Sequence, residues 1–321
     1  MWKFLKTLQQ NLIWSIPVSM VLGLVFGYLV DAAFLKSYII PLTFLMVYPM
    51  MVTLNIRQLL KAGDTKLQFT ALAINFAITP FIGYGIGRLF FPDRPLLVLG
   101  ILLTSLLPTS GMTISWTGFA KGNMPAAVKM TVIGLIVGSL ATPLYLKGLM
   151  GTVVEISLME VFSQILFIVF LPLILGALTQ FLLIRYKGQE SYDTKYKLRF
   201  PLISTLGVLA IVFVSMALKA KAILADPSVL LYYFIPLLAL YGVNFILSTL
   251  VGKYFFKRED GIALVYGTVM RNLSIALALA IGVFGKQGSE IALVISLAYI
   301  IQVQAAAWYV KLTDRLFPKK D

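Results

Sequence analysis

The amino-acid sequence predicts an all-α membrane protein with ten transmembrane helices in two five-helix inverted repeats, of which helices four and nine are discontinuous. Three observations predict this fold. The composition is too apolar for a soluble domain, the basic residues are distributed unequally between alternate loops, and short motifs recur in the same order in both halves. The fourth and ninth apolar segments also carry polar residues at their centres, which predicts that those helices are interrupted.

Composition limits both the class of protein and its chemistry. Of 321 residues, 60% are hydrophobic and only 12% are charged, as expected of a chain that crosses a membrane several times. Cysteine and histidine are absent, which excludes disulfides, thiolate or imidazole metal sites, and catalysis by those side chains. We therefore expect neither an enzyme nor a cofactor or metal site. The first apolar segment lacks a small-residue cleavage site, so we expect no removed signal peptide.

The apolar segments and the basic residues between them predict the topology. Ten segments are long enough to cross a bilayer, at residues 12–31, 38–56, 67–91, 95–120, 124–149, 157–184, 200–222, 228–256, 260–284 and 289–313. Eighteen Lys and Arg residues lie on one side and seven on the other. Because cytoplasmic loops carry the basic excess, both termini are predicted to be cytoplasmic, in an inner or plasma membrane. The net charge of +14 is therefore explained by basic residues in the loops on one side of the lipid bilayer, and nucleic acid is not expected as a partner.

Motifs at the ends of corresponding segments indicate an internal repeat. Gly87-Arg-Leu-Phe-Phe-Pro-Asp93 is echoed by Gly252-Lys-Tyr-Phe-Phe-Lys-Arg-Glu-Asp260, and a glycine follows each aspartate by seven residues. Phe119-Ala-Lys-Gly-Asn123 is echoed by Phe284-Gly-Lys-Gln-Gly288. Chance similarity between apolar helices with glycine ends is the alternative, but three matching features in the same order make an internal repeat the better explanation. Five segments is an odd number, so the second copy, residues 150–321, is inverted relative to the first, residues 1–149, within a single transporter unit.

The fourth segment contains the polar stretch Leu107-Pro-Thr-Ser-Gly-Met-Thr-Ile-Ser-Trp-Thr117. Pro108 removes one helical hydrogen bond and Gly111 weakens the local helix, so the backbone can open and offer amides and carbonyls to a ligand. Its counterpart in the second repeat is the stretch Gly267–Asn272, where we expect the ninth helix to break near Gly267–Arg271. A simple proline kink is the alternative, but the polar cluster and its repeat counterpart favour a break.

The ninth segment places Arg271 and Asn272 in the middle of an apolar run from Val265 to Gly282. A cation at that depth costs about 2.5–3.5 kcal/mol on insertion scales, so it requires a protein interior, a water-filled cavity or an anion around it. About ten residues, or 15 Å of helix, separate Arg271 from either end, which makes snorkelling difficult. We interpret Arg271 as part of a substrate site; the alternative is a structural tie between helices.

Two further segments carry polar groups at depth. Lys129 lies roughly 9 Å along the fifth segment from Asn123, so it could snorkel to the interface or act within the protein. It is the principal titratable group at depth, because the chain has no histidine and its acids lie near segment ends. Thr131 supplies a hydroxyl on the same segment, and Asn75 in the third segment could line a site or only bridge helices.

Two of these motifs resemble the bile acid:sodium symporter family, including its arsenite-exporter branch. Phe119-Ala-Lys-Gly-Asn123 is similar to the family's "LAKGD" segment, and Met270-Arg-Asn-Leu-Ser-Ile-Ala276 to its "MQNAALA" or "NNFELAI" segment. The likeness extends over almost the whole chain. It implies a panel domain of helices at about 12–56 and 157–222, and a core domain of helices at about 67–149 and 228–313. In that core, the resemblance implies, the discontinuous helices four and nine cross.

The chain departs from the family pattern at the ion sites that this resemblance implies. The acidic sodium ligand of the ninth segment corresponds to Gly267 and the neighbouring glutamine to Arg271. The Ser-Asn pair of the fourth segment becomes Thr113-Ile114, and a serine of the fifth becomes Ala127, although Thr131 keeps a hydroxyl. Both sodium sites therefore look dismantled. Thiol-dependent arsenite handling is excluded, because the chain contains no cysteine.

Together these features predict a secondary active transporter of a small organic anion that works by alternating access without sodium coupling. The residues expected to face the substrate are Arg271, Asn272, Thr109, Ser110, Thr113 and Asn75. Lys129 and Thr131 are expected to act in coupling, with protons as the coupling ion, while the two fixed cations Lys129 and Arg271 could hold the shape that sodium maintains in relatives. Two alternatives stay open: a sodium-coupled organic anion symporter, and a non-transporting membrane sensor or scaffold. The sequence does not predict the oligomeric state.

Overall fold

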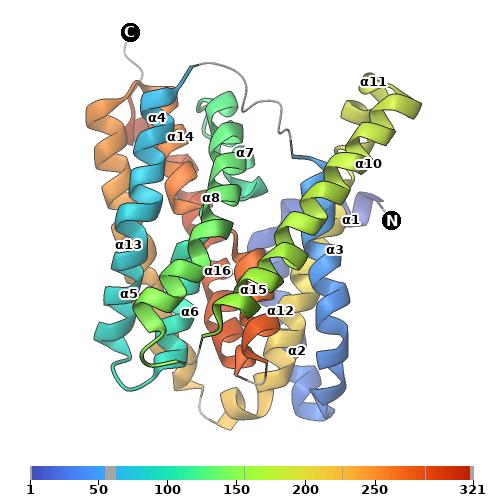
Figure 1. The fold of residues 1–321 in the computed structure, drawn as a ribbon, viewed down its shortest axis with the longest axis vertical. Helices are drawn as coiled ribbons and strands as arrows, with labels where there is room; N and C mark the ends of the chain where they lie inside the picture. The colour runs from blue at the N-terminus through green and yellow to red at the C-terminus, as the bar shows by residue number, and fades with distance from the viewer. Residues whose placement is uncertain (1, 55–62, 155, 226, 286, 319–321) are drawn as a thin grey trace. The chain divides into compact units, whose positions relative to one another are not determined.

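The computed structural model describes residues 2–54, 63–154, 156–225, 227–285 and 287–318. Within these ranges the secondary structure is helical, as Figure 1 shows, and no β-strand is formed beyond an isolated bridge between Pro108 and Arg271. The prediction of an all-α protein is therefore confirmed. Arg57 and Lys61, two of the basic residues that enter the predicted topology, lie outside the described residues.

The described residues contain six helical segments that are long and apolar enough to cross a membrane. They are Thr65–Phe90, Met124–Met150, Leu158–Lys187, Gln189–Leu218, Leu230–Phe255 and Gly288–Leu316. Shorter apolar helices cover Pro41–Val52, Pro95–Leu106 and Leu273–Phe284. The protein is thus a multi-pass membrane protein, whereas the full count of ten spans, the inverted repeat and the division into panel and core stay predictions.

The chain divides into two compact units. Unit one comprises residues 1–54, 159–231 and 274–296, and unit two comprises residues 55–158, 232–273 and 297–321. The elements of unit one are α1 (Trp2–Gln10), α2 (Leu12–Leu29), η1 (Ala32–Tyr38), α3 (Ile39–Val52), α9 (Leu158–Ile165), η4 (Leu166–Phe170), α10 (Leu171–Lys187), α11 (Gln189–Ser191), η5 (Tyr192–Tyr196), α12 (Phe200–Ala225) and α15 (Leu273–Phe284). The elements of unit two are α4 (Thr65–Leu72), η3 (Ala73–Ile78), α5 (Thr79–Phe90), α6 (Pro95–Leu106), α7 (Gly111–Phe119), α8 (Met124–Met150), most of α13 (Ser228–Phe255) and α14 (Arg258–Val269); α16 (Gly288–Leu316) begins in unit one and ends in unit two.

Small residues let the helices of unit one pack closely. α12 packs along both α2 and α3. At Gly27 an added Cβ would lie 2.0 Å from the Ala217 carbonyl oxygen, and at Gly207 it would lie 2.6 Å from the Met46 backbone. Glycine is therefore required where α2 and α3 touch α12, as is usual where membrane helices approach one another.

Unit two contains a long helical rod in which α4, η3 and α5 follow one another without a gap (Figure 1). The middle piece is π-helical, and it precedes Pro80, which has no N–H to donate to the Phe76 carbonyl. The Tyr145 hydroxyl donates to that carbonyl instead. The Phe76 carbonyl, which Pro80 leaves without a helical donor, therefore has a partner. The same π-helical turn carries Asn75.

The close packing of α2 on α12 generates the first prediction. Gly27→Val should lower the midpoint of thermal unfolding of the purified protein, because the new side chain meets the backbone of α12 rather than a movable side chain. Overpacking of this kind costs about 1–3 kcal/mol. Gly85→Val is the matched control, since nothing lies within 4 Å of a Cβ added at that helical glycine. Equal effects of the two substitutions would contradict the proposed packing.

Candidate functional site

The first break in unit two lies between α6 and α7. Helix α6 ends at Leu106, and Leu107 is non-helical with φ −104° and ψ 86°, as expected for a residue before proline. Thr109 adopts a left-handed conformation with φ 65°, which is uncommon for a β-branched residue. Ser110 then begins α7 as its N-cap: its hydroxyl accepts from the Met112 N–H at 3.2 Å, and the Thr113 hydroxyl accepts from the Ser110 N–H at 3.0 Å.

The second break lies between α14 and α15. Helix α14 ends at Val269, Met270 is extended with φ −70° and ψ 124°, and α15 begins at Leu273. The sequence predicts this break near Gly267–Arg271, with Gly267 as a break residue; the structure places the break at residues 270–272 and Gly267 inside α14. Residues 270–272 include neither proline nor glycine, so no local breaker interrupts the helix there. Tertiary hydrogen bonds from other elements replace the helical ones instead.

The two breaks hydrogen-bond to each other through their backbones. The Thr109 N–H donates to the Met270 carbonyl at 2.7 Å, and the Asn272 N–H donates to the Leu107 carbonyl at 2.8 Å. These bonds make Pro108 and Arg271 an antiparallel bridge pair. Groups that each interrupted helix leaves without a helical partner are thereby satisfied by the other, which is necessary where water is absent.

Gln302 of α16 completes the second break. Its side-chain oxygen accepts from the Arg271 N–H at 2.7 Å, and its side-chain nitrogen donates to the Arg271 carbonyl at 3.2 Å. The Tyr241 hydroxyl of α13 donates to the same side-chain oxygen at 2.9 Å. All three residues are buried. Sequence reasoning missed Gln302 and Tyr241, although a glutamine at the centre of an apolar segment is the same kind of signal as Asn75.

The Arg271 guanidinium lies at the carboxyl ends of two helices. Nη1 donates to the Ser105 carbonyl in the last turn of α6 at 3.3 Å, and Nη2 donates to the Thr268 carbonyl in the last turn of α14. Among the described residues no carboxylate pairs with it, although it is only 2% exposed. Each helix carboxyl end carries about half a negative charge, so two of them offset roughly one guanidinium.

Buried polar atoms without a hydrogen-bond partner lie on two of the residues that the sequence predicts to face a substrate. Over the described residues these atoms are Arg271 Nε, Asn75 Oδ1 and Ser139 Oγ. The side-chain nitrogen of Asn75 donates to the Gly267 carbonyl at 2.9 Å, which fixes the amide against α14. An N–H donor on Arg271 and an oxygen acceptor on Asn75 are therefore still available, and leaving such groups unpaired is costly.

The hydroxyl groups predicted for the site are bonded within unit two. Thr109 Oγ1 lies 2.6 Å from the Pro108 carbonyl oxygen and 3.3 Å from the Thr131 carbonyl oxygen of α8. This close approach to α8 requires glycine at residue 134, because a Cβ there would lie 2.7 Å from Thr109 Oγ1. The Thr131 hydroxyl donates to the Ala127 carbonyl at 2.8 Å. The structure thus brings the first break against the residues of α8 that the sequence associates with coupling.

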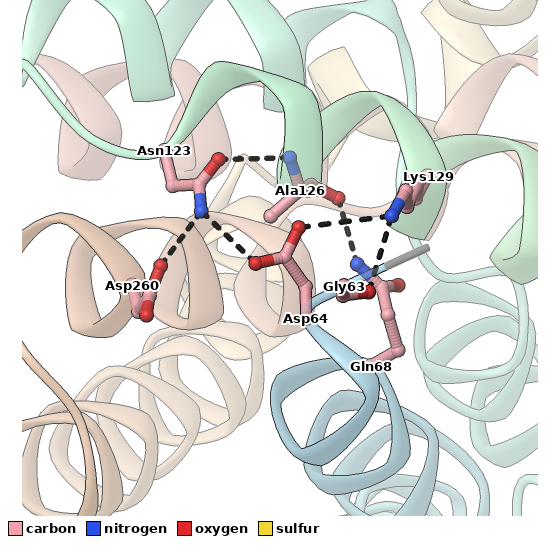
Figure 2. A network of polar contacts seen from close by, with 7 residues as sticks. All are labelled: Gly63, Asp64, Gln68, Asn123, Ala126, Lys129 and Asp260. Carbon is pink, nitrogen blue, oxygen red and sulfur yellow. Dashed lines mark hydrogen bonds and ion pairs between the residues drawn. The ribbon is translucent and has the colours of Figure 1, made fainter. Parts of the chain in front are cut away.

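Lys129 belongs to a separate polar network, shown in Figure 2, where α4, α8 and α14 begin. Its Nζ lies 3.8 Å from Asp64 Oδ2 and donates to the Gly63 carbonyl at 3.1 Å. Asn123 caps α8 through the Ala126 N–H, and its side-chain nitrogen donates to Asp260 at 2.7 Å and to Asp64 at 3.4 Å. Lys129 therefore does not snorkel freely, because its side chain is 6% exposed and paired with Asp64. Sequence reasoning did not identify Asp64 as its partner.

A methionine occupies the space beside Gly267, the position aligned with an acidic ligand in the resemblance described above. A Cβ added there would lie 2.2 Å from the Met130 sulfur. Met130 is buried in a cluster with Leu67, Ala71, Ile74, Ala126, Ala263 and Leu264. The packing between α8 and α14 at this point is apolar, so no side-chain oxygen of residue 267 could be accommodated without repacking.

Comparison with known proteins relates the chain to membrane transporters. The model of the Sodium Bile acid symporter family matches residues 40–226, more than half of the chain. The arsenical-resistance protein Acr3 of Corynebacterium glutamicum is 23% identical over 244 residues, which cover 71% of this chain and 65% of that protein, slightly less than two thirds of its length. Acr3 of Alkaliphilus metalliredigens is 26% identical over 292 residues, covering 85% and 80%. The uncharacterized sodium-dependent transporter YocS of Bacillus subtilis is 24% identical over 209 residues, covering 64% and 62%.

The polar network generates the second prediction. Asn123→Asp keeps the cap of α8 but loses the donors to Asp64 and Asp260 and adds a like charge beside them. The loss of a charge-assisted hydrogen bond and the added repulsion should destabilise the protein by about 1–3 kcal/mol, as a lower unfolding midpoint. Raising the KCl concentration should recover part of this loss by screening. Asn11→Asp, at an exposed helix start without a capping bond, is the control. A salt-independent midpoint equal to that of the wild type would refute the role of Asn123.

Proposed function

We propose, from the premise that the chain belongs to the Sodium Bile acid symporter family, that this protein is a secondary active transporter of a small organic anion. The family is one of symporters, and the relative YocS is called a transporter, which supports a transporter rather than an enzyme. Transport would proceed by alternating access in a fold of ten spans and two inverted repeats. Both termini would be cytoplasmic, in an inner or plasma membrane.

The observation that carries this proposal is the junction of the two broken helices around Arg271. The guanidinium occupies the carboxyl ends of α6 and α14, whose partial charges are negative. The amino ends of α7 and α15 begin at Gly111 and Leu273, next to the same breaks, and their partial charges are positive. Because Arg271 already offsets the negative helix ends, the remaining positive helix ends favour an added anion. The unpaired Arg271 Nε–H supplies a hydrogen-bond donor for that anion.

A carboxylate fits this junction better than an arsenical does. Those relatives are called arsenical-resistance proteins, whereas this chain has no cysteine with which to bind arsenic through sulfur. A planar guanidinium with a free N–H is suited to a carboxylate oxygen. The residues proposed to face the substrate are Arg271, Asn272, Thr109, Ser110, Thr113 and Asn75.

Sodium coupling is not part of the proposal, although one relative is called sodium-dependent. Sodium is held by oxygen ligands, and residue 267 cannot carry one beside the Met130 sulfur. Ile114 and Ala127 likewise have no side-chain oxygen. Arg271 instead provides a permanent positive charge that bridges carbonyls of α6 and α14, so the junction does not need a bound metal ion to hold its shape.

Protons are the coupling ion that we propose, with Lys129 as the group that carries them. Arginine stays charged at any workable pH and cannot release a proton during a transport cycle. A lysine ammonium can give up a proton, and the Asp64 carboxylate beside Lys129 is a group that can receive it. Lys129 is 4% exposed and Asp64 is its ion partner, so the loss of a proton from the pair would change the contact between α8 and the start of α4.

The third prediction tests anion recognition. The purified full chain is screened for a rise in its unfolding midpoint in potassium buffer and in sodium buffer. The compounds are the potassium salts of acetate, pyruvate, succinate, citrate and cholate, together with arsenite. At least one carboxylate should stabilise the wild type by about 2.7 kcal/mol at 100 times its dissociation constant, equally in both buffers. Arg271→Lys should weaken this binding at least tenfold, because an ammonium group lacks the planar fork.

Arg258→Lys is the matched control for that experiment, since Arg258 pairs with Asp314 away from the junction and should leave anion binding unchanged. Stabilisation that requires sodium would establish the sodium-coupled alternative. A response to arsenite alone, or to none of these compounds, would reject a carboxylate substrate.

The fourth prediction concerns coupling. In proteoliposomes with an imposed pH gradient, Lys129→Gln should still bind the best carboxylate of the screen but should not concentrate it, because the titrating group is gone while the junction is intact. Lys121→Gln, an exposed lysine on the preceding loop, is the control and should accumulate the carboxylate like the wild type. Accumulation driven by pH in Lys129→Gln would show that Lys129 only holds α8 to α4.

A further inference from the structure

We propose that Gln302 is the positioning residue of the anion site: its side-chain amide holds the backbone of Arg271 and so sets the direction of the guanidinium. This inference rests on the proposed function only for its effect on anion binding. Its structural part depends on the hydrogen bonds of unit two alone.

The pairing geometry of the two breaks creates the need for such a residue. The bonds between the breaks come from the residues that flank the bridge pair: Thr109 donates to Met270, and Asn272 donates to Leu107. In an antiparallel pair of this kind the central residues do not bond to each other, and their own N–H and C=O groups point away from the partner strand. Pro108 has no N–H, but Arg271 has both groups. Buried and extended, Arg271 therefore needs a donor and an acceptor on its outer side.

Gln302 supplies both from a single amide. Its oxygen accepts from the Arg271 N–H at 2.7 Å and its nitrogen donates to the Arg271 carbonyl at 3.2 Å, in the manner of a neighbouring strand. Among the twenty side chains only glutamine and asparagine carry a donor and an acceptor spaced like those of a peptide. Gln302 is 0% exposed, so water does not compete for these bonds.

The Arg271 backbone itself sets the orientation of the amide. Its N–H can only donate and its carbonyl can only accept, so the Gln302 oxygen lies toward the N–H and the nitrogen toward the carbonyl. A flipped amide would place two donors against each other at the Arg271 N–H. The Tyr241 hydroxyl donates to the same Gln302 oxygen at 2.9 Å and so helps to hold the amide in this place.

Without this clamp the second break has no local reason to exist. Residues 270–272 contain neither glycine nor proline, and the helix could close over them if the Arg271 backbone lost its partners. Closing would rotate the Arg271 side chain relative to the carbonyls of Ser105 and Thr268, which hold the guanidinium. Gln302 thus acts on the substrate through Arg271 without touching the substrate itself.

The test observes Arg271 directly in the full chain, with arginine labelled with ¹⁵N at Nε. The Arg271 Nε–H signal is the one that disappears in Arg271→Lys. Gln302→Met, which removes both bonds at similar volume, should shift this signal and speed its exchange with water. Gln302→Glu, which keeps an acceptor but loses the donor, should shift it as well, and Tyr241→Phe should do so to a smaller extent. Gln68→Met is the matched control, because Gln68 is a buried amide that donates to the Ala126 carbonyl of α8.

Binding of acetate, pyruvate, succinate and citrate is then measured on the same variants. We expect at least a tenfold loss of affinity in Gln302→Met and Gln302→Glu, and none in Gln68→Met. An unchanged Arg271 signal in folded Gln302→Met or Gln302→Glu would overturn the positioning role. If the signal moves but the wild type binds none of the four carboxylates, the positioning role stands and the proposed anion function fails.

Discussion

An unpaired backbone N–H or C=O group in an apolar environment costs several kcal/mol, and this constraint determines how unit two can interrupt its helices. A single break would leave the ends of α6 or of α14 without partners. Two breaks placed together satisfy one another through Thr109, Met270, Asn272 and Leu107. Residue 271 then finds its remaining backbone partners in the Gln302 amide. The two breaks are therefore one structural feature, because the backbone hydrogen bonds of each are completed by the other.

The same reasoning decides between the two interpretations of Arg271, as a structural tie or as a substrate residue. Its Nη atoms bond to carbonyls of two helix ends, which is the geometry of a tie. Those helix ends carry about one negative charge between them, so they account for a buried guanidinium without any carboxylate. They do not account for the unpaired Nε–H, nor for the positive ends of α7 and α15, which begin next to the two breaks. The tie and the substrate role use different atoms of one side chain, and the proposed function requires both.

Part of this site could be predicted from the sequence because local rules govern it. Pro108 dictates the non-helical Leu107 before it, and the Ser110–Thr113 pair dictates the start of α7. The depth of Arg271 in an apolar segment indicated an unusual environment before any contact was known. The second break, however, is produced by tertiary bonds from Gln302, and the partner of Lys129 is Asp64, a residue separated from it by 65 positions. Composition and periodicity carry no information on which distant residues meet. The sequence therefore indicated the stretch Gly267–Arg271 for the break but singled out Gly267, which lies inside α14.

Helix α8 connects the polar network with the junction over a very short distance. Lys129 contacts Asp64, while the next two carbonyls along α8, those of Met130 and Thr131, lie within hydrogen-bonding distance of Thr109 in the first break. Thr109 is held in a left-handed conformation that a β-branched residue adopts only under the constraint of its surroundings. A change of charge at Lys129 that shifts this turn of α8 would therefore act on the most constrained residue of the junction. The proposed coupling between Lys129 and the proposed anion site would thus require one turn of one rigid helix, rather than a pathway through many side chains.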